Sequence, residues 1–598
     1  MLSVSAVLNA QNCTPASSVS TLDINNVSVA MLNGGDMWWD FSQSRYEVPQ
    51  GSGKTAFFAH ALWLAATDDD DNIYTAALRY RTSGNDYWAG PIVTDSNGIN
   101  TVDCDEFNRH WSLTKAEIDA FIDGTVSTVP EPILNWPAKG NPNFSVSIEQ
   151  DLAPFYDVNG DGLYSSDSGD YPLIKGDQAI FWVMNDIGNI HTASGGQQLG
   201  VEIHVMAYAY ATNDVINNSI YYDYTILNKG EQPYHDFRIG FFTDSDMGNP
   251  LDDFIGCDSA KNLGYTYNGD PNDENAQGQL GYGTELPIVG VQMVNLPRNS
   301  QGEEFPMAHF GYFNNQSGPF GDPNTASDYL NYLSGKWRHG VRWTEGGNGY
   351  GGTAPANFIY PGNPSDTNTW TECSVGNNPG DRRMVTSFGP MRFDRGTSIS
   401  FTEASIFSQK EEYEGGCVDI QPFLDETDIV RDHGVDEKCE NFQAMIDATI
   451  TDTEFSAQEG AVEINITGTQ GILDYSWSNG ATSKDIFNLP IGDYTVTVSN
   501  TFGCSEEATF TVDEIFGIGQ IAPFKLNISP NPSNTGRFRV RTNESSEVNA
   551  KVYNVLGELV EDMVVINELD LSAHESGLYL VTFESEGQKA TSRLIVTK

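Results

Sequence analysis

Positive charge is scarce in this sequence of 598 residues. Only 31 Lys and Arg side chains stand against 82 Asp and Glu, which leaves a net charge of −51. Nucleic acids and anionic membrane surfaces would repel such a chain, so we expect no nucleic acid as a partner. Carboxylates in this excess also repel one another, and bound cations commonly offset that repulsion.

Long apolar runs are missing as well. No stretch of 18 apolar residues occurs, so we expect no transmembrane helix. Charged residues make up 19% of the chain and aromatic residues 11%, a composition that excludes a solvated disordered polymer. The 58 Gly and 26 Tyr favour loop-rich β-structure over helical bundles. The length predicts roughly three to five domains.

Motifs of the common enzyme classes are absent too. The chain contains neither a GxSxG elbow nor an HExxH helix. Residues 51–55 (GSGKT) end like a phosphate-binding loop, but Val48 stands where its first glycine belongs. We therefore assign no catalytic or cofactor-binding residue and expect a protein that is not an enzyme. Carboxylate pairs suited to glycoside hydrolysis remain an open alternative, because an acidic β-protein offers many of them.

The seven cysteines show no CxxC or Cys/His spacing, so no zinc site is predicted. Residues 1–11 look like the remnant of a signal peptide cleaved after Ala10, with an ordinary N-terminal strand as the alternative. Export would permit disulfides. We predict Cys417 with Cys439 as the best pair, since they flank a helix expected over 422–435.

Hydrophobic periodicity predicts a mostly β, multidomain fold. Apolar residues alternate over 201–208, 222–226 and 397–407, which is typical of strands, and the turn at 229–233 predicts that 222–226 pairs with 237–242. A capping box at Thr114–Glu117 predicts one helix. We expect a β-sandwich or jelly-roll-like N-terminal body followed by two small immunoglobulin-like β-sandwich modules. The expected boundaries are 12–195 and 196–415 for the two β-rich regions of the body, 416–444 for a helical linker, 445–514 and 524–598 for the modules, and 515–523 for the linker between them.

One acidic loop has the spacing of a calcium site. Residues 157–163 read D-x-N-x-D-G-x, so that oxygens at alternate positions converge as the chain turns. The twelfth position holds Ser168 where a glutamate is usual. The predicted ligands are Asp157, Asn159, Asp161, the carbonyl of Leu163, and Asp167 or Asp170. An Asx-rich turn whose side chains cap their own backbone is the alternative.

A second group of carboxylates follows a predicted strand. Its members lie at the end of that strand and in the loop after it. Closely spaced carboxylates repel one another, and a bound divalent ion removes this repulsion. We predict calcium here as well, bound by Asp244, Asp246, Asp252, Asp253 and Asp258. A third acidic run, Asp68–Asp71, is more typical of a solvated turn.

The final 75 residues resemble the C-terminal sorting domain (type A) of the type IX secretion system of Bacteroidota. The motifs that carry the resemblance are Ile528–Pro532 with Gly536, Val552–Asn554 with Gly557, Leu569–Leu571, Gly577–Val581 and Arg593–Lys598. The resemblance implies recognition by the outer-membrane translocon, and then release or attachment at the cell surface.

The module before it resembles a SprB-type repeat of cell-surface proteins. Its matching residues are Tyr475–Gly480, Ile486, Leu489–Pro490, Gly492–Val498 and Gly503–Cys504. Only one copy is visible, which leaves a spacer role open. The body itself is similar to an uncharacterised region of exported proteins with this sorting domain, on the segments Asn33–Trp39, Asp157–Pro172 and Asp244–Asn268.

Two functions follow as expectations. The first is an exported binding or structural protein with calcium-stabilised loops, secreted or held at the outer-membrane cell surface, which adheres to a glycan or surface protein or self-assembles. Trp38, Trp39, Trp88 and Trp337 are candidates for its contact face, with burial in the core as the alternative. The second is a secreted polysaccharide-active hydrolase that carries the same sorting tag.

Overall fold

The computed structural model describes residues 13–95, 98–101, 104–144, 148, 151–299, 301–315, 317–411, 413–439, 442–454, 458–514, 526–542, 547–585 and 588–598. The predicted signal remnant at 1–11 and the linker at 515–523 lie outside these residues. The chain divides into two compact units, one made of 1–452 with 458–512 and the other of 453–457 with 513–598.

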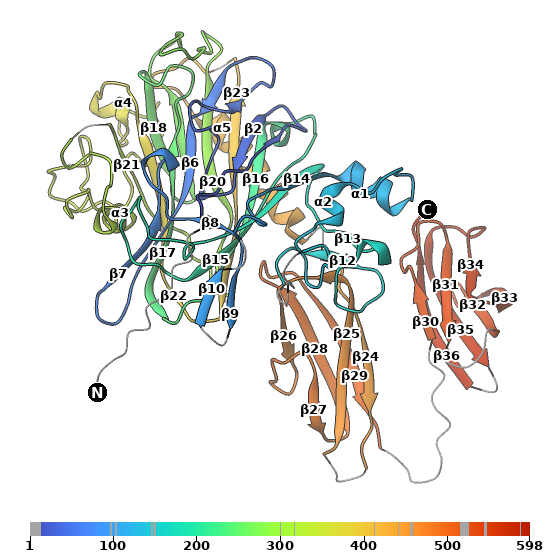
Figure 1. The fold of residues 1–598 in the computed structure, drawn as a ribbon. Helices are drawn as coiled ribbons and strands as arrows, with labels where there is room; N and C mark the ends of the chain where they lie inside the picture. The colour runs from blue at the N-terminus through green and yellow to red at the C-terminus, as the bar shows by residue number, and fades with distance from the viewer. Residues whose placement is uncertain are drawn as a thin grey trace, which may run out of the picture. The chain divides into compact units, whose positions relative to one another are not determined.

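The body of the first unit is a β-sandwich (Figure 1). Within the described residues, its large antiparallel sheet has the order β11 (Trp111–Thr114), β14 (Gln178–Asn185), β15 (Val201–Ala209), β16 (Ser219–Asn228), β23 (Ser398–Gln409), β20 (Pro287–Arg298), β19 (Leu263–Asn268) and β18 (Asp253–Asp258), with β8 (Trp88–Ala89) beside β14. The second sheet has the order β21 (Met307–Phe313), β22 (Arg383–Phe393), β17 (Tyr234–Asp244), β6 (Ala59–Thr67) and β3 (Asp36–Met37), with β7 (Ile73–Ala77) beside β6.

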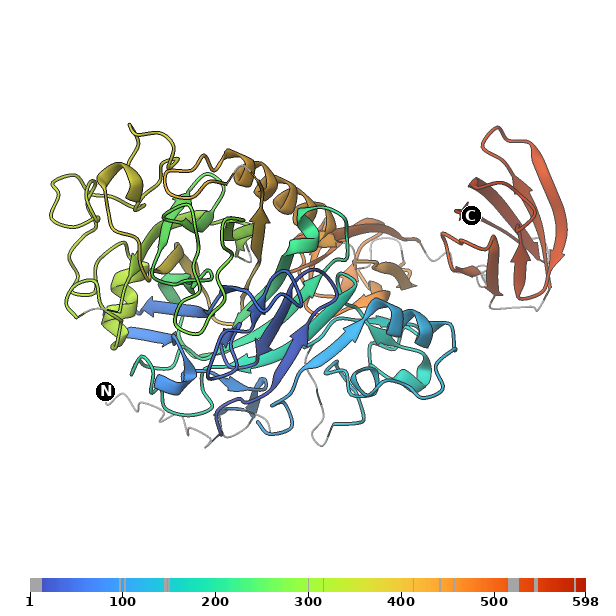
Figure 2. The same ribbon diagram turned by 90° about the horizontal axis from the view of Figure 1, so that it is seen from above.

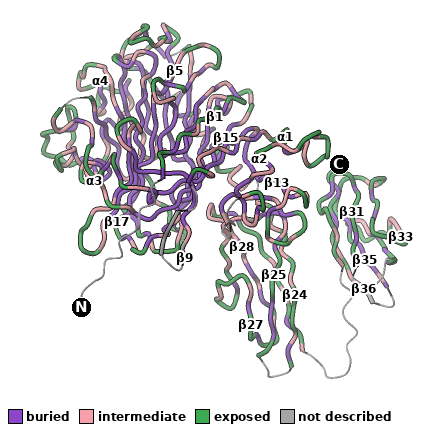
Figure 3. The backbone as a smooth tube through the Cα atoms, viewed as in Figure 1, coloured by how far each residue is buried: buried purple, intermediate pink, exposed green. Residues whose placement is uncertain are grey.

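The large sheet is buried on both faces. Ile180 and Trp182 of β14 point into the core between the two sheets, whereas Phe181 and Val183 point into a second core on the other face. Side chains alternate along a strand, so a sheet covered on both sides needs apolar residues at every position. Figure 3 shows how densely these buried residues fill the body.

Helices and short strands complete the body. The second core is covered by α5 (Gln421–Asp436), which packs along β20 and β23 (Figure 2). The capping box predicted at Thr114 begins α1 there, as expected. The remaining elements are α1 (Lys115–Ile122), α2 (Glu131–Leu134), α3 (Ala326–Leu333), α4 (Glu372–Val375), η1 (Arg81–Ser83), η2 (Ser166–Ser168), η3 (Val215–Asn218), η4 (Glu437–Cys439), β9 (Ile92–Asp95), β10 (Gly98–Thr101) and a small sheet of β1 (Val19–Leu22), β2 (Ser28–Leu32), β4 (Tyr46–Glu47) and β5 (Thr55–Phe57).

One prediction about packing was wrong, and one alternative left open for the tryptophans is decided. The segment 222–226 does not pair with 237–242, because β16 belongs to the large sheet and β17 to the second sheet. The turn at 229–233 thus crosses the sandwich. A contact face of exposed tryptophans is also excluded, because Trp38, Trp39, Trp88 and Trp337 are at most 3% exposed. The strands at 201–208 and 397–407 and the helix at 422–435 are confirmed by β15, β23 and α5.

A small β-module follows α5 in the chain. Its core is built on Trp477, Tyr494 and Val496. Its strands are β24 (Met445–Thr451), β25 (Gly460–Gln470), β26 (Leu473–Trp477), β27 (Ile486–Leu489), β28 (Gly492–Asn500) and β29 (Ser505–Val512). β25 also pairs with β12 (Phe155–Asp157), which in turn pairs with β13 (Tyr171–Pro172), so this module shares a sheet with the body (Figure 1).

The second unit contains two antiparallel sheets around a core that includes Phe538, Val552 and Phe583. One sheet has the order β30 (Leu526–Ser529), β31 (Arg537–Thr542) and β34 (Glu568–Asp570). The other has the order β33 (Leu559–Val565), β32 (Val548–Tyr553), β35 (Gly577–Ser585) and β36 (Gln588–Val596). The predicted mostly β fold with a sandwich body is confirmed.

The predicted disulfide between Cys417 and Cys439 is wrong. The structure pairs Cys373 with Cys417, Cys439 with Cys504, and Cys13 with Cys104. Cys417 and Cys439 lie beyond opposite ends of α5, whose 16 residues at about 1.5 Å each hold them about 24 Å apart. A disulfide needs Cα atoms about 4.4–6.8 Å apart. The remaining thiol, Cys257, is buried.

Candidate metal centre and ligand cleft

Three carboxylates meet where β17 ends and β22 begins. Asp244 is the last residue of β17, Asp246 follows it, and Asp381 precedes Arg383, which pairs with Asp244 in the sheet register. One oxygen from each of the three carboxylates lies within 4.8 Å of the others. Asp244 is 2% exposed. Antiparallel pairing therefore brings together acidic residues about 140 positions apart in the chain.

Polar neighbours balance part of this charge. The Tyr80 hydroxyl donates a hydrogen bond to Oδ2 of Asp244. Arg383 forms ion pairs with Asp244 at 3.6 Å and with Asp381 at 3.1 Å. Arg383 also pairs with Asp322 at 3.3 Å, and Asp322 pairs with Arg79 at 2.8 Å.

Burial and mutual repulsion disfavour ionisation at this centre. Burial raises the pKa of Asp246 well above its ordinary value, and the negative charges of Asp244 and Asp381 add to the rise. Burial raises the pKa of Asp244 as well, against the opposing charge of Arg383. Burial, with the charge of Asp244, raises the pKa of Asp381 to about 6. Without a cation, the three carboxylates therefore retain protons more readily than isolated ones.

The other acidic residues predicted for this site are not among the three carboxylates that meet, although Asp253 is close by and accepts a hydrogen bond from the N–H of Met247, the residue after Asp246. Asp252 and Asp253 are buried at the start of β18, and burial raises the pKa of both, to about 7 for Asp252. Asp258 lies at the opposite end of β18, where it accepts hydrogen bonds from the backbone N–H groups of Ala260 and Lys261. Sequence reasoning missed Asp381, because only the β17–β22 register brings it to Asp244.

A polar cleft of about 590 Å³ opens beside this centre, and Asp246 is part of its wall. Thr21 on β1 and Ser28 on β2 line the cleft from the small sheet. Because alternate residues of a strand point to the same face, this face of the small sheet forms part of the cleft wall. Further polar side chains come from the turn after β3 and from the loop before β20. The cleft is lined among others by Asp40, Gln43, Arg45, Glu47, Thr55, Phe58, Gln277 and Gln279.

One charged pair of the cleft is held in place by its own turn. Asp40 accepts hydrogen bonds from Ser42 and Gln43 and forms an ion pair with Arg45 at 2.6 Å. Burial opposes ionisation of Asp40, but these hydrogen bonds and the guanidinium outweigh it and lower the pKa to about 2. Asp40 is therefore an anion that holds Arg45 by an ion pair in the cleft wall.

The loop predicted as a calcium site is closed by its first and last acidic residues. Asp157 and Asp170 are both fully buried. The carboxylate of Asp157 accepts hydrogen bonds from the N–H groups of Gly160 and Gly162 at 2.6 and 2.8 Å, and that of Asp170 accepts from Val158 at 2.9 Å and Ser165 at 2.8 Å. Burial raises the pKa of Asp170, and the charges of Asp157 and Asp161 add to it.

The rest of that loop faces outward. Asn159 accepts a hydrogen bond from the N–H of Asp161, and Asp161 accepts one from the N–H of Leu163. Asp167 is exposed in η2. The carboxylates of Asp157 and Asp170 thus cap backbone N–H groups of their own loop, as the Asx-rich turn predicts, and calcium binding by this loop stays a prediction.

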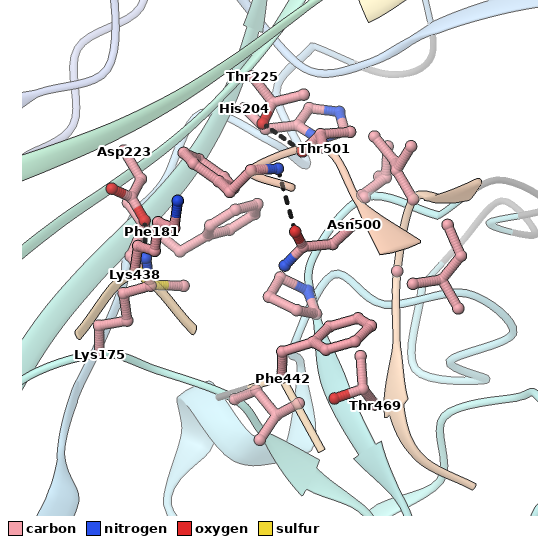
Figure 4. Close-up of a pocket in the computed structure, with 18 residues that line it drawn as sticks. Lys175, Phe181, His204, Asp223, Thr225, Lys438, Phe442, Thr469, Asn500 and Thr501 are labelled. Atoms are coloured by element: carbon pink, nitrogen blue, oxygen red, sulfur yellow. Dashed lines mark hydrogen bonds and ion pairs between the residues drawn. The ribbon is translucent and has the colours of Figure 1, made fainter. Parts of the chain in front are cut away.

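A smaller, mostly apolar pocket of about 130 Å³ lies between the large sheet and the small module (Figure 4). Its principal charged pair is internal, with Lys175 Nζ 2.6 Å from Asp223 and 5.0 Å from the centre of the Phe502 ring. The pocket therefore marks the packing of the module against the body.

The second unit of the chain matches a known family. Residues 527–597 match the family model described as the secretion system C-terminal sorting domain. The chain is thus a protein exported by the type IX secretion system to the cell surface or the extracellular space, and its sorting domain interacts with that machinery. Among the described residues, no helix has the length and apolar character needed to cross a membrane.

Other comparisons add only distant likenesses. No curated protein matches the chain. Similar solved structures include a polysaccharide lyase (8% identity, 61% of this chain, 40% of that one, TM-score 0.17) and latent PorU from Porphyromonas gingivalis (15% identity, 60% and 35%, TM-score 0.16). An amphioxus IgVJ-C2 molecule shares 14% identity over 26% of this chain and 97% of its own, with a TM-score of 0.10. The chain thus spans 40% or less of the length of the first two.

Proposed function

We propose that this exported chain is a binding protein of the cell surface rather than an enzyme, and that its polar cleft takes a hydroxyl-rich ligand such as a glycan. The observation that carries the proposal is the cleft itself. Carboxylate, amide and guanidinium groups from separate segments converge on one hollow of about 590 Å³. Such groups donate and accept hydrogen bonds in the way that sugar hydroxyls require, and Phe58 offers apolar surface for a ring face.

The rest of the chain fits a surface role. In this proposal the module at 445–514 is a SprB-type spacer and the sorting domain supplies the address. The loop from Asp157 to Asp170 binds a structural calcium ion, which would replace the backbone donors now facing two buried carboxylates. Because β12 begins this loop and pairs with β25, calcium there would stiffen the connection between body and spacer.

A glycan array probed with the full chain tests the proposal. The variant R45A removes a guanidinium that is half exposed in the cleft, and we expect it to lower binding at least about tenfold, since a charge-assisted contact contributes about 1.5–3 kcal/mol. The matched control is R392A, which removes a comparably exposed arginine paired with Asp394 outside the cleft. Equal binding by R45A, R392A and wild type would exclude the cleft.

A polysaccharide-active hydrolase is the second candidate. The observation that favours it is that three carboxyl side chains, Asp40, Glu47 and Asp246, line the same cleft, and glycoside hydrolysis uses two such groups. The test is release of reducing sugar from polysaccharides by the full chain and by E47Q. Release that disappears in E47Q would replace the binding proposal with this one.

A further inference from the structure

We infer that Asp244, Asp246 and Asp381 form a single calcium site at the junction of β17 and β22. The sequence predicted Asp244 and Asp246 as calcium ligands but not Asp381, which comes from a segment far along the chain and replaces Asp252, Asp253 and Asp258 in the ligand set. Its assignment is independent of what the cleft binds.

Unpartnered buried oxygens point to a missing ligand. Oδ1 of Asp244 and Oδ1 of Asp381 are both inaccessible to solvent and have no hydrogen-bond partner. A buried carboxylate oxygen without a hydrogen-bond donor loses its hydration, and no protein contact offsets that free-energy cost. Asp244 is only 2% exposed. Its place at the end of β17 holds its carboxylate next to those of Asp246 and Asp381. A cation between these carboxylates would give both side chains a counter-charge in place of the missing hydrogen bonds.

The spacing suits one ion without rearrangement. Calcium holds its oxygen ligands at about 2.3–2.6 Å, so two oxygens on opposite sides of the ion are about 5 Å apart. The three carboxylate oxygens lie within 4.8 Å of one another. All three can therefore lie on one coordination sphere, and the remaining positions would be filled by water or backbone oxygens.

The charge balance leaves room for a dication. Four carboxylates, those of Asp244, Asp246, Asp381 and Asp322, are offset by the guanidiniums of Arg383 and Arg79. The cluster thus carries a formal charge of −2. Calcium would neutralise it, whereas a third arginine or lysine would add only one charge.

The position of the site links it to the cleft. Asp246 is shared by the carboxylate cluster and the cleft wall. Calcium binding would hold the chain after β17 in place, and this segment continues into the cleft. If the proposed glycan binding is correct, that binding should strengthen when calcium is present.

The test uses the full chain and calcium alone as the probe. Titration calorimetry counts calcium equivalents for wild type, D246N, D381N and the control D258N, whose carboxylate caps a turn at the other end of β18. We expect D246N and D381N each to lose one equivalent that D258N keeps. Thermal melting without calcium should place D246N at or above wild type, because one repelling carboxylate is gone, while the calcium-induced rise should be smaller than that of wild type by at least about 3 °C, the part due to this site.

Loss of a calcium ligand and loss of a structural contact give different results. Unchanged calcium equivalents in both D246N and D381N would overturn the inference. A D246N variant that melts lower and still gains the full rise with calcium would show a structural role only, and also overturn it. If D246N fails to fold, D381N decides, since Asp381 is one-quarter exposed. Glycan binding that persists with EDTA would leave the proposed function standing without this site.

Discussion

Removal of the disulfide between Cys439 and Cys504 should loosen the small module from the body. Cys439 ends η4 after α5, and Cys504 lies in the turn between β28 and β29. Their Cα atoms are 5.5 Å apart. The bridge therefore fastens one end of the module to the body, while the pairing of β12 with β25 fastens another edge.

The expected loss follows from the length of the closed loop. The two cysteines are 65 residues apart. In the chain-entropy model, a bridge over that loop removes about 14.5 cal/mol/K from the unfolded state, which corresponds to about 4 kcal/mol at 25 °C. The double variant C439S/C504S should lose a free energy of unfolding of that order.

Two measurements check this expectation. Peptide mapping without reductant should recover linked peptides containing Cys439 and Cys504, and none linking Cys417 to Cys439. Hydrogen exchange should then show faster exchange in β24–β29 of C439S/C504S. The matched control is C373S/C417S, which opens a bridge spanning 44 residues in the body and should leave exchange in the module unchanged.

Either of two results would refute the reasoning. One is a linked peptide joining Cys417 to Cys439, which would require α5 to be absent or broken. The other is a loss below about 1 kcal/mol with unchanged exchange in the module, which would mean that the shared sheet alone holds it.

Three further predictions concern buried polar groups. Burial, aided by nearby arginines, lowers the pKa of His110 to about 3 and that of His309 to about 4, from an ordinary value of 6.5. As the pH falls, the unfolded chain therefore takes up these two protons before the folded chain does. The two neutral rings contribute their full stability above pH 6.5, and this contribution is lost below it. Denaturant titrations at pH 6.5 and at about pH 5 check this. Between the higher and the lower pH, the free energy of unfolding of H110Q and of H309Q should each rise by about 2 kcal/mol relative to that of wild type, and a difference from wild type that is the same at both pH values would contradict the prediction. Both ring nitrogens of His191 lie 2.7 Å from backbone carbonyl oxygens in the buried interior, so H191L would remove a buried hydrogen-bond partner from these carbonyls and should cost about 1–3 kcal/mol in a denaturant titration. EDTA should lower the melting temperature and speed proteolysis near Gly160, and D157N should abolish the effect on proteolysis near Gly160 if the loop binds calcium.

The sequence revealed features that depend on neighbours in the chain. The capping box at Thr114 requires only residues three positions apart, and α1 begins there. Alternation of apolar residues predicted β15 and β23 because the period of a strand is local. The Asx-rich turn after Asp157 was recognisable for the same reason, since its side chains accept hydrogen bonds from backbone N–H groups of the same short segment.

Long-range pairing was not accessible in the same way. The segments at 222–226 and 237–242 look like a hairpin. In the structure both faces of β16 are buried, and its two edges pair with β15 and β23, so no edge is left for β17. The chain therefore crosses to the other sheet at 229–233. Alternation alone does not distinguish a hairpin from such a crossing, because both place an apolar strand on each side of a short turn.

The carboxylate centre shows the same limit for function. Asp244 and Asp246 are recognisable because they lie at the end of a strand, but the next acidic residues along the chain, Asp252, Asp253 and Asp258, do not complete the cluster. β18 carries Asp253 and Asp258 into the large sheet, while the β17–β22 register brings Asp381 to Asp244 from about 140 residues away. Charges that are close in sequence lie on one flexible loop and can separate, whereas charges fixed by a sheet register cannot. A repulsive cluster held by a register needs a counter-charge, and this is why the proposed cation site rests on the meeting of three carboxylates in the fold and on their buried, unpartnered oxygens, and not on the density of acidic residues along the sequence.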